Sequence, residues 1–157
     1  MSNEAARDIL VQGARAVAHA DSLGESLERL FRVLAERLDI ESAVIVVPED
    51  PDRLSIVGSV GLEDSAIAGL ARAVQNPGHP IARTLVDPVP SFDVLPSVPG
   101  GPALRSHLPL SVIRDGTETV LGVLALAHQR SLDAEPRLLL EAAADLAAVA
   151  VERHGRP

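Results

Sequence analysis

Residues 105–130 read RSHLPLSVIRDGTETVLGVLALAHQR, and this stretch decides the predicted fold. Two apolar runs flank Asp115-Gly116, a dipeptide typical of the tight turn of a β-hairpin. In the second run, residues 120–127, apolar side chains occupy both alternating sets of positions, so both faces of this strand should be covered. The sequence LLLEAAADLAAVAVERH that follows has apolar residues at helical spacing. The stretch therefore predicts a buried hairpin followed by an amphipathic helix.

The preceding residues predict two helical segments, a second hairpin and a third helix. Ser22 and Glu25 form a capping-box pattern, and the sequence leaves open whether the helical segments on either side of Ser22 are one bent helix or two. The predicted elements are helices at 4–20, 22–38 and 63–75 and strands at 42–47 and 54–60. The order helix, hairpin, helix, loop, hairpin, helix predicts an antiparallel sheet with a layer made from the first and last helices.

Residues 76–104 interrupt this regular pattern, because they contain most of the 12 prolines. Residues 80–85 have room for one or two helical turns, while Pro88 and Pro90 restrict any strand there to a sheet edge. An ordered surface loop is the simplest interpretation of this composition, but loops of this length in compact domains are more often functional. The segment is therefore a candidate for carrying ligand-binding residues.

The composition argues against several classes of function. The 157 residues suit a single domain, and their net charge of -8 argues against nucleic-acid binding, which requires clustered Lys or Arg. Cysteine and lysine are absent, so the chain has no disulfide, no thiolate ligand and no Schiff-base lysine. No apolar run is long enough to span a bilayer, and the polar N-terminus MSNEAARD is unlike a signal peptide. We expect a cytoplasmic protein without nucleic-acid or membrane partners.

The segments His107-Leu108-Pro109-Leu110 and Gly122-Val123-Leu124, together with the closing helix, resemble the C-terminal half of a GAF domain. The resemblance extends over roughly residues 22–153. It implies an α/β (α+β) fold in which an antiparallel sheet has the terminal helices on one face and a pocket walled by a loop and a helix on the other. It also implies that residues 76–104 form one wall of that pocket. We interpret residues 1–157 as a single GAF-like domain, with residues 1–21 as an N-terminal dimerisation helix.

GAF domains are small sensor modules that bind a ligand or mediate dimerisation, and the resemblance implies the same role here. Members that attach bilins or reduce free methionine sulfoxide use cysteines, and the cyclic-nucleotide motif Asn-Lys-Phe-Asp-Glu needs a lysine, so the sequence fits none of these. Ser106 and His107 are adjacent on a predicted strand, so their side chains point to opposite faces and cannot pair as nucleophile and base. We expect a domain that is not an enzyme.

Five residues are candidates for binding a small ligand, which is expected to be polar or anionic. His79, Arg83 and Phe92 lie in the proline-rich segment, whereas Arg105 and His107 begin the strand after it. His107 belongs to the less apolar face of that strand, and two guanidinium groups near one cavity can clamp an anion. The resemblance places a pocket between these two parts of the chain, so the five side chains are expected to converge there.

Other interpretations of these residues stay open. Either arginine could form a surface ion pair with Asp87 or Asp93, and Phe92 could plug the cavity instead of covering a ligand. A histidine facing the cavity could be a satisfied structural residue, or it could ligate a metal or haem. His128, near a strand end, is expected to be exposed to solvent. The sequence identifies no cofactor.

The leading hypothesis is a sensory domain that binds a small ligand between the sheet and residues 76–104 and signals through dimerisation or a partner protein. A ligand-free dimerisation or adaptor module is one alternative, and a haem- or metal-binding sensor is another. A pocket of about 300 Å³ or more would favour a ligand-binding domain over the adaptor. A homodimer is predicted through the terminal helices, with contacts from Ile9, Leu10, Val17, Leu146 and Val149.

Overall fold

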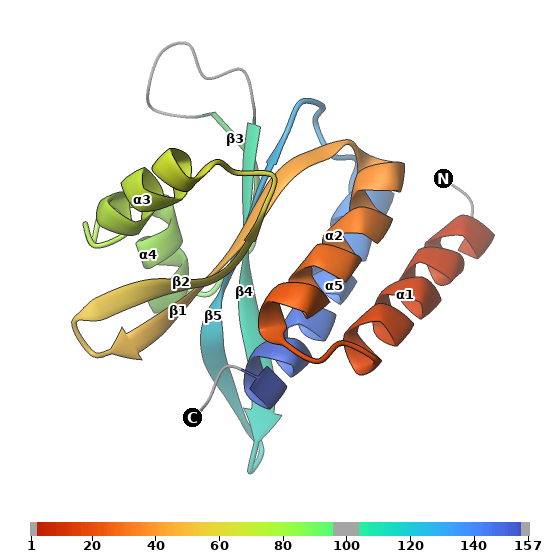
Figure 1. Ribbon diagram of the computed structural model, residues 1–157. Helices are drawn as coiled ribbons and strands as arrows, with labels where there is room; N and C mark the ends of the chain where they lie inside the picture. Colours follow the sequence, from red (N-terminus) through yellow and green to blue (C-terminus); the bar gives the residue numbers. More distant parts are fainter. Residues whose placement is uncertain (1–2, 96–103, 155–157) are drawn as a thin grey trace.

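The computed structural model describes residues 3–95 and 104–154 of the chain. Its centre is a five-stranded sheet in which every pair of neighbouring strands is antiparallel (Figure 1). In spatial order the strands are β2 (Arg53–Val60), β1 (Ile40–Asp50), β5 (Thr117–His128), β4 (Leu104–Arg114) and β3 (Ser91–Val94). The antiparallel sheet predicted from the order of the elements is therefore confirmed.

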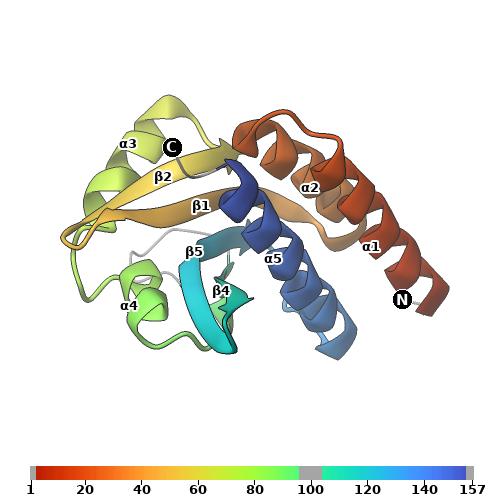
Figure 2. The ribbon, with the colours of Figure 1, turned by 90° about the horizontal axis from the view of Figure 1, so that it is seen from below.

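Helices cover both faces of the sheet (Figure 2). The helices on one face are α1 (Asn3–Ala18), α2 (Leu23–Leu38) and α5 (Ala134–His154), and those on the other are the shorter α3 (Asp64–Ala73) and α4 (Pro80–Val86). The first two helices are separate, since Ser22 has extended backbone angles and caps α2 by accepting a hydrogen bond from the Glu25 amide at 3.1 Å. Within the residues described, none of the helices combines the length and the apolar character needed to cross a membrane. The predicted layer of terminal helices on one face is confirmed.

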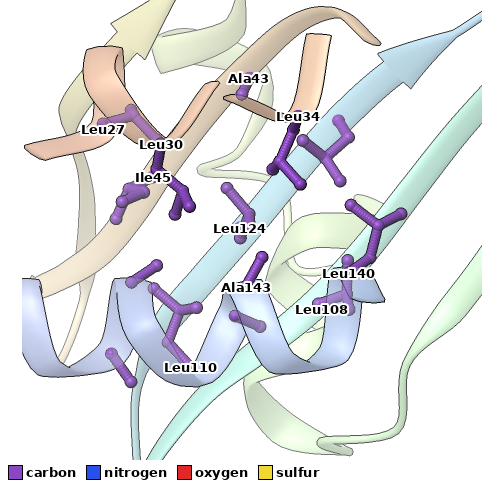
Figure 3. Close-up of a cluster of buried hydrophobic side chains, with 14 of the residues drawn as sticks. Leu27, Leu30, Leu34, Ala43, Ile45, Leu108, Leu110, Leu124, Leu140 and Ala143 are labelled. Carbon is purple, nitrogen blue, oxygen red and sulfur yellow. The ribbon is translucent and has the colours of Figure 1, made fainter. Parts of the chain in front are cut away.

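The main hydrophobic core fills the space between the sheet and helices α2 and α5 (Figure 3). It is built from aliphatic side chains that include Leu27, Leu30 and Leu34 of α2, Leu140 and Ala143 of α5, and Ile45, Leu108, Leu110 and Leu124 of the sheet. Burying one leucine or isoleucine side chain contributes about 1.5–3 kcal/mol. In a chain whose only aromatic residues are two phenylalanines, this aliphatic core is the main source of stability.

The central strand β5 is covered on both faces, as its apolar sequence predicts. Leu124 and Leu126 belong to the main core under α2 and α5. Val123 and Ala125 belong instead to a smaller cluster on the opposite face, which includes Ile81 of α4. Alternate positions of one strand therefore serve two different layers of the molecule.

Two glycines set the shape of the β4–β5 hairpin and its approach to β1. Asp115 and Gly116 have φ angles of 51° and 77°, the left-handed pair that a tight type I′ turn requires. A β-carbon at Gly122 would lie 2.5 Å from the carbonyl oxygen of Val46 and 2.9 Å from Cγ1 of Val47. Since real β-carbons do not approach a backbone oxygen so closely, glycine at this position is what lets β5 lie against β1.

The contrast between Gly122 and Gly69 of α3 gives a direct test of this packing. Gly122→Ala should lower the free energy of unfolding by about 1–3 kcal/mol or more, because the new methyl group forces the two strands apart. Gly69→Ala should raise it by about 0.5–1 kcal/mol, since its β-carbon meets nothing within 4 Å and alanine favours the helix. Scanning calorimetry measures both changes, and a wild-type Tm for Gly122→Ala would contradict the close approach.

Candidate functional site

A cavity of about 460 Å³ lies between the sheet and helices α3 and α4. Its floor is formed by two rows of residues that pair across β4, β5 and β1, namely His107, Ala125 and Val44 in one row and Arg105, Ala127 and Ser42 in the other. Its walls include Leu70 of α3, Ile81 of α4 and Val94 of β3. The cavity is larger than about 300 Å³, the volume above which a ligand-binding domain is favoured over a ligand-free adaptor. It also lies on the face of the sheet where a pocket was predicted.

His79 and His107 bring two imidazoles to this cavity. His79 precedes α4 and caps it, because its Nδ1 atom accepts a hydrogen bond from the Ile81 amide at 3.1 Å. In the neutral ring the proton is therefore on Nε2. Burial lowers the pKa of His79 below its ordinary value. The capping bond explains why a histidine stands at the start of α4, and it leaves the second ring nitrogen available as a donor.

His107 is the most informative residue of the site. Its side chain is only 3% exposed, and none of the described residues gives its Nδ1 atom a hydrogen bond. Burial, followed by the positive charges of His79 and Arg105, lowers the pKa of His107 to about 4, so the ring is neutral at pH 7. A buried polar atom without a partner costs about 1–3 kcal/mol. The cavity is thus lined by a residue whose Nδ1 atom is buried without a hydrogen-bond partner among the described residues.

The structure does not bring all five predicted site residues to the cavity. His79, Arg105 and His107 line it, whereas Arg83 is exposed on α4 and is not part of its lining. Phe92 packs against the main core, with the guanidinium of Arg137 4.9 Å from its ring centre. The described contacts of Phe92 therefore place it on the α5 side of the sheet and not over a ligand.

The position of Phe92 follows from a local change in backbone conformation. In a regular strand Phe92 and Val94 would face the same side, but Asp93 between them has a left-handed φ of 56° and the pairing of β3 with β4 shifts there. Alternation is broken at this point. As a result Val94 lines the cavity while Phe92 packs toward α5.

A buried hydrogen bond joins Ser106 of β4 to His128 of β5. The two side chains are completely buried, and Ser106 Oγ lies 2.7 Å from His128 Nε2. His128 Nδ1 lies 2.8 Å from the carbonyl oxygen of Arg130, which can only accept, so in the neutral ring Nδ1 carries the proton and Nε2 accepts from the serine hydroxyl. The expectation that His128 is exposed is wrong, because the strand continues to His128 and the following turn covers it.

Ser106 and His128 meet because of an irregularity in the pairing of β4 and β5 that the sequence alone does not reveal. Counting outward from the Asp115-Gly116 turn places Ser106 opposite Ala125, whereas the structure pairs it with Leu126 because the register shifts at Leu110 and Ser111. With this shift His128 becomes a diagonal neighbour of Ser106 on the same face. A serine and a histidine in contact can act as nucleophile and base, yet here both are inaccessible, so the pair serves as a structural link.

Asp93 extends this polar network from the cavity wall to α5. Its carboxylate accepts hydrogen bonds from the Leu132 amide at 3.0 Å and from the Arg137 guanidinium at 2.9 Å. Its own amide donates to Ser106 Oγ at 3.3 Å. Because Val94, the next residue, lines the cavity, the network ties that wall directly to the first turn of the C-terminal helix.

Metal binding was one of the open interpretations of the histidines. Within residues 3–95 and 104–154, no three His, Cys, Asp or Glu side chains are placed together so that they could hold a metal ion. Haem ligation by a single histidine stays a prediction. Neither phenylalanine of the chain is part of the cavity lining, so no phenyl ring would flank such a group.

Comparisons with known proteins agree with this architecture. Residues 22–151 match the GAF domain family. The GAF domain of a phosphoenolpyruvate-protein phosphotransferase from Coxiella burnetii is similar in structure, with a TM-score of 0.76, 17% identity and coverage of 97% of this chain and 96% of that one. The nlh2 GAF domain of A. aeolicus gives a TM-score of 0.68 at 15% identity, covering 96% of this chain and 97% of that one.

An enzyme is also among the similar structures. Free methionine-R-sulfoxide reductase from Neisseria meningitidis, in complex with its substrate, gives a TM-score of 0.67 at 16% identity and covers 97% of this chain and 92% of that one. No curated protein matches the chain by sequence. At these identities the structural likeness establishes the fold, and the fold is shared by domains with different activities.

The buried neutral state of His107 predicts a pH-dependent stability. Below pH 6.5 the unfolded chain binds a proton at this histidine, whereas the folded chain binds it only near pH 4. The free energy of unfolding should therefore be highest above pH 6.5 and fall by about 2 kcal/mol from this residue between about pH 7.5 and pH 5. Denaturant titrations of wild type and His107→Asn at both pH values measure the difference. His19→Asn, at an exposed histidine, is the control, and equal pH dependence in all three proteins would contradict the assignment.

The Asp93 network predicts a second difference in stability. Asp93→Asn should lower the free energy of unfolding by about 1–2 kcal/mol, because it removes the charge from a bond to Arg137 that is partly shielded from water. Asp39→Asn is a matched control, since Asp39 also has a left-handed φ of 53° but its partner Arg130 is 83% exposed at 3.6 Å. That change should cost less than about 0.5 kcal/mol. Urea denaturation measures the free energy of unfolding of both variants. Equal losses would mean that Asp93 stabilises the protein no more than an ordinary surface ion pair does.

Proposed function

The chain belongs to the GAF domain family, and on that premise we propose that it is a sensory domain that binds a small polar or anionic ligand in the cavity beneath α3 and α4. The observation that carries the proposal is His107, which lines a cavity of about 460 Å³, is 3% exposed and has an unpartnered Nδ1 atom. A permanent cation, Arg105, lines the same cavity. Polar atoms and positive charge within an otherwise apolar hollow favour a small ligand that carries a hydrogen-bonding or anionic group.

A regulatory role is favoured over catalysis. The sequence has no cysteine, so the thiol chemistry that the resemblance associates with methionine sulfoxide reduction is not available to it. The Ser106–His128 contact is closed to substrates, because both side chains are completely buried. We therefore propose that the domain reports ligand binding and performs no reaction. Its cytoplasmic location stays a prediction.

The route by which binding is reported is proposed to run through α5. Val94 contributes to the cavity, and Asp93 beside it holds both the Leu132 amide and the Arg137 side chain at the start of α5. A ligand that moves the cavity wall would therefore act on the C-terminal helix through a short chain of hydrogen bonds. Tight packing transmits such a shift to neighbouring elements.

A homodimer through the terminal helices completes the proposal. Part of the predicted surface is used within the chain, since Leu10 and Leu146 pack against its own core. Val11 of α1 and Val149 of α5 are 44% and 54% exposed, and these apolar side chains are available to a second copy or to a signalling partner. The side chains of Ile9 and Val17 lie outside the described residues.

Thermal unfolding against a panel of small anions and metabolites, with the mass measured by light scattering in the same samples, tests the proposed function. A ligand at about 100 times its Kd should stabilise the wild type by about 2.7 kcal/mol, and it should have little effect on His107→Asn. A concentration-dependent dimer mass that Val149→Arg abolishes would support signalling through the helices. If no compound raises the Tm while the dimer persists, the ligand-free adaptor becomes the better interpretation. A monomer at every concentration would reject the homodimer.

A further inference from the structure

The cavity floor separates positive charge from apolar surface. Arg105 and His107 lie on β4, at one end of the two rows of paired residues, and β1 contributes the other end. The middle of each row is an alanine of β5, Ala125 or Ala127. Since neighbouring strands are about 4.8 Å apart, the floor from β4 to β1 measures about 10 Å. A molecule lying along it would have its polar end at β4 and its body over small or apolar side chains.

The charges that line the cavity are of one sign. None of the described lining residues is acidic, although the chain has 22 acidic and only 14 basic side chains. An ammonium group bound there would meet Arg105 and two imidazoles without a carboxylate to pair with it, which is a costly burial. The cavity therefore favours an anion and disfavours amines and zwitterions.

The remaining surface of the cavity favours a flexible aliphatic body. The only aromatic residues of the chain are Phe31 and Phe92, and neither is part of the lining. Flat ring systems are most often held by stacking on Phe, Tyr or Trp side chains, and none of these lines the cavity. The walls instead present aliphatic side chains such as Leu70 and Ile81. A small inorganic anion would leave this apolar end without contact.

We infer that the cavity takes an aliphatic monocarboxylate without an amino group, with the carboxylate at Arg105 and His107 and the chain directed toward β1 and α3. The inference rests on the proposed sensory function. A guanidinium binds a carboxylate through two parallel hydrogen bonds, and Arg105 is the only permanent cation among the described lining residues. An anion beside the His107 imidazole favours its protonated form, so binding tightens as the pH falls.

Calorimetric titration of the full chain with acetate, butyrate, hexanoate, hexylamine, norleucine, nitrate and phosphate tests the ligand class. We expect affinity to rise about fourfold per added methylene from acetate to hexanoate. Hexylamine and norleucine should bind at least about tenfold more weakly than hexanoate, because their ammonium group finds no carboxylate. Hexanoate should also bind more tightly at pH 6 than at pH 8.

Variants assign the binding to this cavity. Arg105→Gln and His107→Asn should each weaken hexanoate binding at least about tenfold. Gly69→Leu should weaken it by obstruction, since Gly69 lines the cavity and its β-carbon position is open. Ala66→Leu, at another lining residue of α3, gives the same test if Gly69→Leu does not fold. Arg32→Gln, at an exposed arginine of α2 on the opposite face, should bind hexanoate as the wild type does.

Two kinds of failure can be told apart. If norleucine or hexylamine binds as tightly as hexanoate, if chain length has no effect, or if only nitrate or phosphate binds, the ligand class is wrong while the sensory function stands. Hexanoate binding that none of the cavity variants weakens would also overturn the inference, because the site would lie elsewhere. If no probe binds and no compound of the broader panel raises the Tm, both the ligand class and the proposed sensory function are rejected.

Discussion

The fold depends on burying the central strand β5 on both of its faces. Leu124 and Leu126 must meet an apolar layer on one side, and α2 and α5 supply it with a tightly packed set of leucines and alanines. The opposite face is not completely filled, because Ala125 and Ala127 are too small to occupy the space between the sheet and helices α3 and α4. The same strand therefore creates a filled core on one side and a cavity on the other. The position of the candidate site is a consequence of side-chain size along this strand.

Much of this arrangement can be predicted from local sequence patterns. The Asp115-Gly116 turn, the two-sided apolar strand after it and the closing helix are short-range signals, and the structure confirms them. The one or two helical turns for which residues 80–85 have room occur as α4 (Pro80–Val86). The cavity position of His107 follows from alternation along β4, which places it on the face opposite to Leu108 and Leu110 of the main core.

Two failures of prediction, at Phe92 and His128, involve irregular strand pairing, whereas Arg83 lies on the exposed side of α4. Phe92 was expected at the cavity, and the left-handed conformation of Asp93 turns it toward α5. His128 was expected in solvent because it lies near a strand end, but β5 continues to His128, which is completely buried, and the register shift beyond Leu110 places it beside Ser106. An irregularity of one residue changes the face of every side chain that follows it. Such irregularities are set by tertiary contacts, for example the bonds that Asp93 makes with Leu132 and Arg137, and these have no local signature.

The alternation along β5 also has a consequence for how this fold can diversify. Odd positions such as Ala125 and Ala127 form the floor of the cavity, whereas even positions such as Leu124 support the core. An added methyl group at an odd position changes the shape presented to a ligand without entering the leucine layer. Evolution can therefore explore new ligand preferences through single substitutions while the determinants of folding stay constant. In this architecture, ligand selectivity and folding stability depend on different residues of the same strand.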